Sequence, residues 1–151
     1  VEVLNVFNSA LEKAKFNVGH NIKFDVNIVG CELFRKQITS PLEDMDVLDT
    51  CSEKTATMCQ IPGGRGGRFK LPKLEELHKF LFQEGFSEAH NAAFDVEATT
   101  RCFLELIRTK RLSDTELKAE PGYVNKFVGA HPSPIQAIGL SAKNAKYSPS
   151  W

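Results

Sequence analysis

The sequence has little of what marks a membrane protein or a disulfide-linked protein. No run of about 18 apolar residues, the length that a membrane-spanning helix needs, is found. We therefore expect no membrane partner and a cytoplasmic location. The four cysteines form no CxxC pair and no Cys/His group with zinc spacing, and we interpret them as reduced, mostly buried thiols: Cys31, Cys51, Cys59 and Cys102.

An excess of charge of one sign is also missing. Lysine plus arginine number 19, and so do aspartate plus glutamate, so affinity for nucleic acid must come from a local patch. At 151 residues the chain has the length of one domain. We expect that domain to span residues 1–112 and a tail with a short helix and loops to span 113–151. The sequence lacks an initiating methionine and a signal peptide, which indicates a processed chain or a piece of a longer protein.

Hydrophobic spacing predicts helices around two short strands. Helical periodicity covers residues 1–14, 21–36, 71–85 and 90–110, and strands are predicted at 16–19 and 45–50. Because a helix connects the two strands, we expect them to be parallel. A further short helix is predicted at 113–120.

Two heptapeptides share five of their seven residues: HNIKFDV at 20–26 and HNAAFDV at 90–96. In each, the asparagine is predicted to cap a helix that carries an aspartate, Asp25 or Asp95, in its first turn. The helix dipole, worth about 0.3–1 kcal/mol, is a sufficient explanation for one such aspartate. Two half-buried carboxylates with the same neighbours favour a shared divalent-cation site, since an uncompensated buried charge is costly.

GHNIKFD and HNAAFD resemble the second and third motifs of the DEDDh 3'-5' exonucleases, the family that includes the proofreading epsilon subunit of bacterial DNA polymerase III. The resemblance covers about residues 1–110 and includes the helix LPKLEELHKFLF ahead of the third motif. It implies an α/β, RNase H-like exonuclease fold. The chain would carry only the C-terminal part of this fold, two parallel strands plus packed helices, without the three N-terminal strands.

The resemblance also implies roles for single residues. Asp25 and Asp95 would bind Mg²⁺ or Mn²⁺ in a two-metal site, and His90 would be the general base. Two such ions about 4 Å apart stabilise the attacking and leaving oxygens of a phosphoryl displacement, while a neutral histidine accepts a proton from water. The expected products are 5'-mononucleotides released from a 3' end. Asn21 and His20 would border the substrate.

A glycine-rich loop at residues 61–73 carries a local group of cations. Arg65 and Arg68 could bind nucleic-acid phosphates together with backbone N–H groups, which would set affinity more than sequence preference. A solvated surface loop is the alternative, and we weigh the two interpretations equally because Phe69 is the only aromatic residue among the charges.

Other residues are given less specific roles. Phe24 and Phe94 are interpreted as core anchors, and His78 as a surface or boundary residue of its helix. QAIGL at 136–140 has a loose similarity to sliding-clamp-binding peptides, so that a clamp or a DNA polymerase is a candidate partner. The substrate is a nucleic acid with a 3' end, with DNA favoured over RNA.

The first motif of the family, Asp-x-Glu on an N-terminal strand, has no match in the expected place. The pattern occurs only at residues 95–97 and 114–116, and the family order places it before Val1. Without it the site lacks two carboxylates, so we expect this chain to be inactive alone and its exposed strand edge to favour self-association. The alternatives are a non-catalytic nucleic-acid-binding or assembly module, and a structural fragment without activity.

Overall fold

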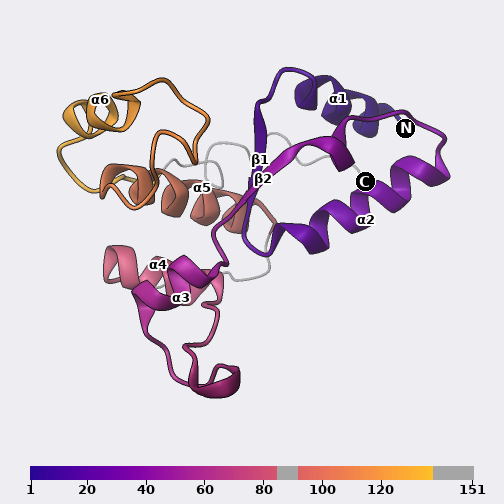
Figure 1. Ribbon diagram of the computed structural model, residues 1–151. Coiled ribbons are helices and arrows are strands. Elements are labelled where there is room, and N and C mark those ends of the chain that lie inside the picture. Colours follow the sequence, from indigo (N-terminus) through magenta and orange to yellow (C-terminus); the bar gives the residue numbers. More distant parts are fainter. Residues whose placement is uncertain (85–91, 138–151) are drawn as a thin grey trace. The chain divides into compact units, whose positions relative to one another are not determined.

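The computed structural model describes residues 1–84 and 92–137. It is a mixed α/β structure, mostly helical, in which two strands pair in parallel (Figure 1). The chain divides into two compact units, Val1–Thr50 and Cys51–Trp151. Within the described ranges, no helix has the length and apolar character needed to cross a membrane.

The first unit is a strand, helix and strand preceded by another helix. Its elements are α1 (Glu2–Leu11), β1 (Phe16–Gly19), α2 (Ile22–Arg35), the 3-10 turn η1 (Leu42–Asp44) and β2 (Asp46–Asp49). β1 pairs with β2 in parallel, in a register that runs from Phe16 opposite Asp46 to Gly19 opposite Asp49. The predicted strands, their parallel pairing and the helix between them are confirmed.

The core of the first unit explains the orientation of α2. Leu33 is buried with residues of α1 and η1, and Val26 and Val29 pack against this cluster. These positions recur every three or four residues and therefore share one face of the helix. Phe24 lies on the opposite face and is 62% exposed. The prediction that Phe24 anchors the core is wrong, because the helical period turns it away from the buried positions.

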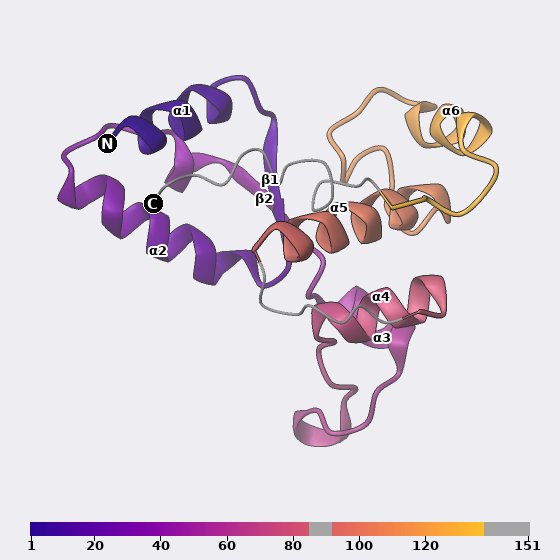
Figure 2. The ribbon, with the colours of Figure 1, turned by 180° about the vertical axis from the view of Figure 1, so that it is seen from behind.

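The second unit is built from helices. Its elements are α3 (Glu53–Cys59), the 3-10 turn η2 (Arg65–Gly67), α4 (Leu74–Phe82), α5 (Ala92–Arg108) and α6 (Tyr123–Ala130). α5 packs against α4 and α6, and α4 also packs against α3 (Figure 2). Leu77 of α4 and Cys102 of α5 are fully buried. Cys102 is the buried one of the four free cysteines and Cys31 is exposed, so the prediction of mostly buried thiols is wrong.

Two helices of the second unit differ from the sequence expectation. α3 is not predicted, although Ser52 accepts a hydrogen bond from the Thr55 amide in a capping box at its start. Residues 113–120 form turns, and the short helix of this region lies further along, at α6. The Asp114 carboxylate accepts hydrogen bonds from the Gly122 and Val124 amides. These bonds close a loop ahead of α6 instead of continuing a helix.

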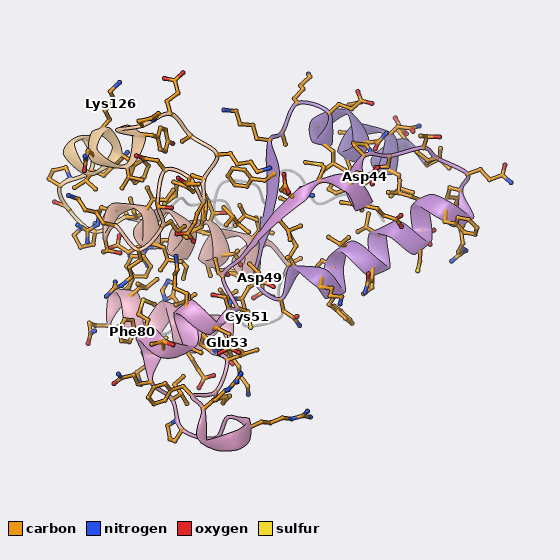
Figure 3. All side chains as sticks on the ribbon, viewed as in Figure 1. Asp44, Asp49, Cys51, Glu53, Phe80 and Lys126 are labelled. Carbon is orange, nitrogen blue, oxygen red and sulfur yellow. The ribbon has the colours of Figure 1, made fainter. Side chains whose placement is uncertain are left out.

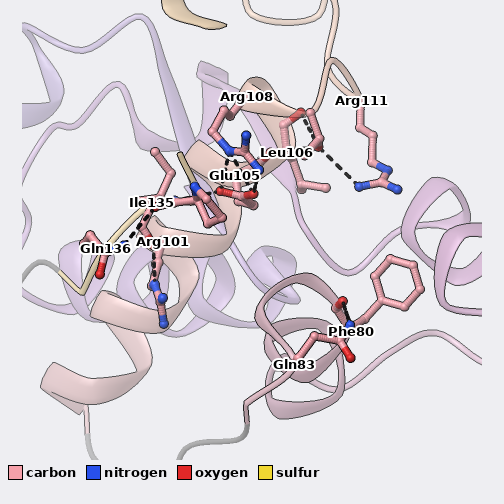
Figure 4. Close-up of polar contacts among 11 residues, drawn as sticks. Phe80, Gln83, Arg101, Glu105, Leu106, Arg108, Arg111, Ile135 and Gln136 are labelled. Atoms are coloured by element: carbon pink, nitrogen blue, oxygen red, sulfur yellow. Dashed lines mark hydrogen bonds and ion pairs between the residues drawn. The ribbon is translucent and has the colours of Figure 1, made fainter. Parts of the chain in front are cut away.

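Glu105 of α5 is a buried acid that holds the C-terminal end of the described chain. Its side chain, 2% exposed, accepts hydrogen bonds from Nε of Arg108 at 2.9 Å and from the Ile135 amide at 2.9 Å (Figure 4). Nε of Arg101 donates to the Ile135 carbonyl at 2.7 Å. Burial raises the pKa of Glu105, but the hydrogen bonds from Arg108 and Ile135 outweigh it, and the pKa lies below the ordinary value.

We expect Glu105→Gln to lower the free energy of unfolding by about 1–3 kcal/mol at pH 7, because a charged acceptor is lost from a buried network. A lowered folded-state pKa stabilises the protein above the ordinary pKa near 4.5 and ceases to do so as pH falls through the folded value. The difference between wild type and variant should therefore shrink below about pH 4.5. Urea unfolding followed by circular dichroism measures both effects.

The matched control for this prediction is Glu120→Gln, which neutralises an exposed acid in the same unit. It should change the free energy of unfolding by less than about 0.5 kcal/mol. Equal losses in the two variants, or a Glu105→Gln loss that stays constant down to pH 3, would contradict the assigned role of Glu105.

Candidate functional site at the ends of the parallel strands

The carboxyl ends of β1 and β2 lie side by side and bring together residues far apart in the sequence. The Thr50 amide donates to the Gly19 carbonyl at 2.9 Å, which extends the pairing one step beyond the strands. In open α/β sheets, ligands bind at this end of the strands. Figure 3 labels Asp49, at the end of β2. We call the following residues the strand-end cluster: His20, Asn21, Asp25, Asp49 and Thr50.

His20 is held by the residue that follows the neighbouring strand. Its Nδ1 lies 2.8 Å from Oγ1 of Thr50, and this hydroxyl donates to the Gly19 carbonyl at 3.2 Å. Because the hydroxyl has one proton and donates it to the carbonyl, the fitting arrangement has Nδ1–H of His20 as donor to Oγ1. The orientation of the ring is thus fixed from the backbone of β1 through a buried threonine.

Asp49 caps α2 from the other strand. Its carboxylate oxygens accept hydrogen bonds from the amides of Asn21 at 2.7 Å and Ile22 at 3.2 Å. Asn21 occupies the predicted N-cap position, but it makes no side-chain cap and adopts a left-handed conformation with φ 61°. Asparagine tolerates this conformation better than most residues. The predicted N-cap position of Asn21 is therefore confirmed, but its side chain makes no capping hydrogen bond, and the side chain that binds the first amides belongs to Asp49.

Asp25 lies one turn into α2 near Asp49. The side chain of Asp25 is exposed, so the prediction that it is half-buried is wrong. Desolvation still raises the pKa of Asp25, and the negative charge of Asp49 raises it further. Two neighbouring carboxylates supply oxygen ligands that suit Mg²⁺ or Mn²⁺, and a cation between them would relieve their repulsion. Over residues 1–84 and 92–137, however, no group of three or more His, Cys, Asp or Glu side chains could hold a metal ion. The carboxylate oxygens of Asp25 and Asp49 are the kind of ligand that such an ion prefers, but two carboxylates do not complete its coordination.

The other predicted catalytic residues belong to the second unit. Asp95 lies in the first turn of α5 and is half-buried, and both features were predicted. His90 lies outside the described residues, and so does part of the 136–140 segment. Of the predicted site residues, the first unit therefore brings together His20, Asn21 and Asp25.

His78 is not a surface residue, which corrects its interpretation. It is 5% exposed, its Nδ1 lies 2.8 Å from the Glu84 carbonyl, and its Nε2 lies 3.1 Å from Nη1 of Arg101. Burial lowers the pKa of His78, and the Arg101 charge lowers it further against the opposing hydrogen bond to Glu84. The spacing of His78 with Leu74, Leu77 and Leu81 on one helix face was the signal for burial.

Arg65 and Arg68 lie on the loop between α3 and α4, and both side chains are exposed. Among the described residues, no ion pair neutralises either of them.

Comparison of the chain with family models, with curated proteins and with solved structures finds no match. The strand-end cluster and this loop are therefore the two local arrangements from which a function can be inferred.

We expect Asp49→Ala to lower the free energy of unfolding by about 1–2 kcal/mol, because the first amides of α2 lose a charged acceptor. Hydrogen exchange at the Asn21 and Ile22 amides should become faster in the same variant. Asp44→Ala, which removes an exposed carboxylate of the same unit, is the control and should leave both measurements near wild type. Unchanged exchange at these two amides in Asp49→Ala would contradict the cap.

Proposed function

We propose that the chain carries the second and third motifs of a metal-dependent DEDDh-type 3'-5' exonuclease with an RNase H-like fold. Such an enzyme hydrolyses phosphodiester bonds at nucleic-acid 3' ends and releases 5'-mononucleotides. The main support is the β1, α2 and β2 arrangement, in which His20, Asn21 and Asp25 of the first heptapeptide gather at the carboxyl end of parallel strands. This is where the motif order would require a metal-binding carboxylate.

The proposed roles follow from the chemistry of the side chains. Asp25 and Asp95 would hold Mg²⁺ or Mn²⁺, which would stabilise the charge on the attacking and leaving oxygens of the phosphodiester. His90 would accept the proton of the attacking water. His20, fixed through Thr50, and Asn21, in its left-handed turn, would line the substrate side of the site.

Two observations are compatible with a second function. The described residues contain no complete group of metal ligands, and the sequence has no Asp-x-Glu ahead of the second motif. A non-catalytic nucleic-acid-binding or assembly module is compatible with both facts. A polymerase or sliding-clamp partner and self-association through the strand edge stay predictions in either case.

The exonuclease proposal is tested on the chain expressed with whatever in-frame residues its gene encodes before Val1. With Mg²⁺ or Mn²⁺, we expect stepwise shortening of a 5'-labelled single strand from its 3' end, with 5'-mononucleotides identified by mass spectrometry. Asp25→Asn, Asp95→Asn and His90→Ala should each lower the rate by about 100-fold or more. The loss has a chemical cause, because each change removes a ligand or the base and adds no bulk.

Asp44→Asn serves as the control and should keep the wild-type rate, since it removes an exposed carboxylate outside the strand-end cluster. Circular dichroism must give the same spectrum for all variants. Wild-type rates in His90→Ala or Asp95→Asn would remove the catalytic assignment. Nucleic-acid binding without hydrolysis under any metal would favour the non-catalytic module.

A further inference from the structure

The loop between α3 and α4 (Figure 1) has a preset shape. The Lys70 amide donates to the Ile61 carbonyl at 2.7 Å and closes the loop. A Cβ added to Gly64 would lie 2.5 Å from the carbonyl oxygens of Arg68 and Phe69, so the close approach of these segments depends on glycine. The loop, residues 61–73, is called the basic loop below.

The cations of the basic loop are not equivalent. Nζ of Lys70 pairs with Glu76 of α4 at 2.8 Å, and the same carboxylate oxygen accepts the Lys73 amide at 2.9 Å. Burial raises the pKa of Glu76, but the hydrogen bonds from Lys70 and Lys73 outweigh it and leave the pKa below the ordinary value. At neutral pH this ionised carboxylate ties the loop to α4. Lys70 is therefore part of the internal structure of the loop.

Arg65 and Arg68 are the exposed cations at the turn of the loop. Arg65 is the first residue of the turn η2, and Arg68 follows its last residue. Gly66 and Gly67 between them adopt left-handed conformations with φ 64° and 77°. Neither guanidinium has an ion-pair partner in the described part of the chain. Two exposed guanidinium groups on one glycine-rich turn are suited to phosphate oxygens.

Phe69 adds a flat apolar surface next to these charges. It follows Arg68 directly in the chain and is 43% exposed. Proteins that bind single strands without sequence preference combine cations that follow the backbone with aromatic rings on which bases stack. A base can reach such a ring only when it is not stacked inside a duplex.

We propose that the basic loop binds single-stranded nucleic acid, with Arg65 and Arg68 on backbone phosphates and Phe69 stacked on a base. This deepens the proposed function, on which it rests, by naming the single strand as substrate class and the loop as the source of affinity. The shared chemistry of DNA and RNA is the phosphodiester backbone, so binding itself does not distinguish them.

The test measures binding without hydrolysis. Fluorescence anisotropy in EDTA follows the 151-residue chain on labelled oligothymidine and oligouridine of about 20 nucleotides. At 0.1 M salt we expect Arg65→Ala/Arg68→Ala to weaken binding by about 10- to 30-fold, and to reduce the slope of log affinity against log salt by about 1.4. Arg65→Lys/Arg68→Lys should keep most of the affinity because the charges remain.

The matched control is Lys36→Ala/Lys126→Ala, which removes two positive charges from exposed positions outside the loop, on the C-cap of α2 and on α6. It should bind within about twofold of wild type, since it lowers net charge without removing a phosphate contact. A control that weakens binding as much as the arginine variant would overturn the proposal in favour of nonspecific charge attraction. Wild-type binding by the arginine variant would overturn it as well.

Phe69→Leu tests the stacking contact. It should weaken binding to the single strand by about fivefold or more and leave binding to a duplex of the same sequence unchanged. Equal effects on both forms would overturn the single-strand assignment. EDTA prevents metal-dependent hydrolysis, so binding by the loop can be confirmed even if the protein has no exonuclease activity. If the protein is an active exonuclease but the loop variants bind as wild type does, the loop proposal is refuted and the proposed function is not.

Discussion

The parallel register of β1 and β2 is the constraint on which the candidate site depends. It places Gly19 opposite Asp49, so that the carboxylate of Asp49 reaches the first amides of α2. A shift of one residue would turn the Asp49 side chain to the other face of the sheet. The start of α2 would then lose its acceptor, and His20 would lose the hydroxyl of Thr50. One pairing therefore sets both the helix start and the histidine orientation.

The acids of this protein differ in what their carboxylates do. Glu105 is buried, yet hydrogen bonds from Arg108 and Ile135 keep its pKa low, so it acts as a fixed structural charge. The carboxylate of Asp49 accepts hydrogen bonds from the backbone amides at the start of α2. Asp25 is exposed, and desolvation and the neighbouring charge of Asp49 both raise its pKa. A cation bound between these two carboxylates would relieve their repulsion.

The histidines follow the same distinction. Both nitrogens of His78 contact neighbouring groups, the Glu84 carbonyl and Arg101, deep in the second unit. His20 is oriented by Thr50 at the strand ends, where a substrate would be expected. His78 therefore belongs to the core of the second unit, because it is buried and both of its nitrogens have partners. His20 belongs to the candidate site, because it lies at the carboxyl end of β1.

The sequence by itself determined the strands at 16–19 and 45–50, the long helices and the parallel pairing, because these follow from local periodicity and from a helix connecting two strands. It could also have placed His78 in the core, since the spacing of its leucines was visible. The tertiary structure alone decided that Asp49 caps α2 and that Asp114 closes a loop ahead of α6. The physical reason is that the Asp49 cap joins residues 28 positions apart, so it exists only once strand register and helix rotation are set by packing.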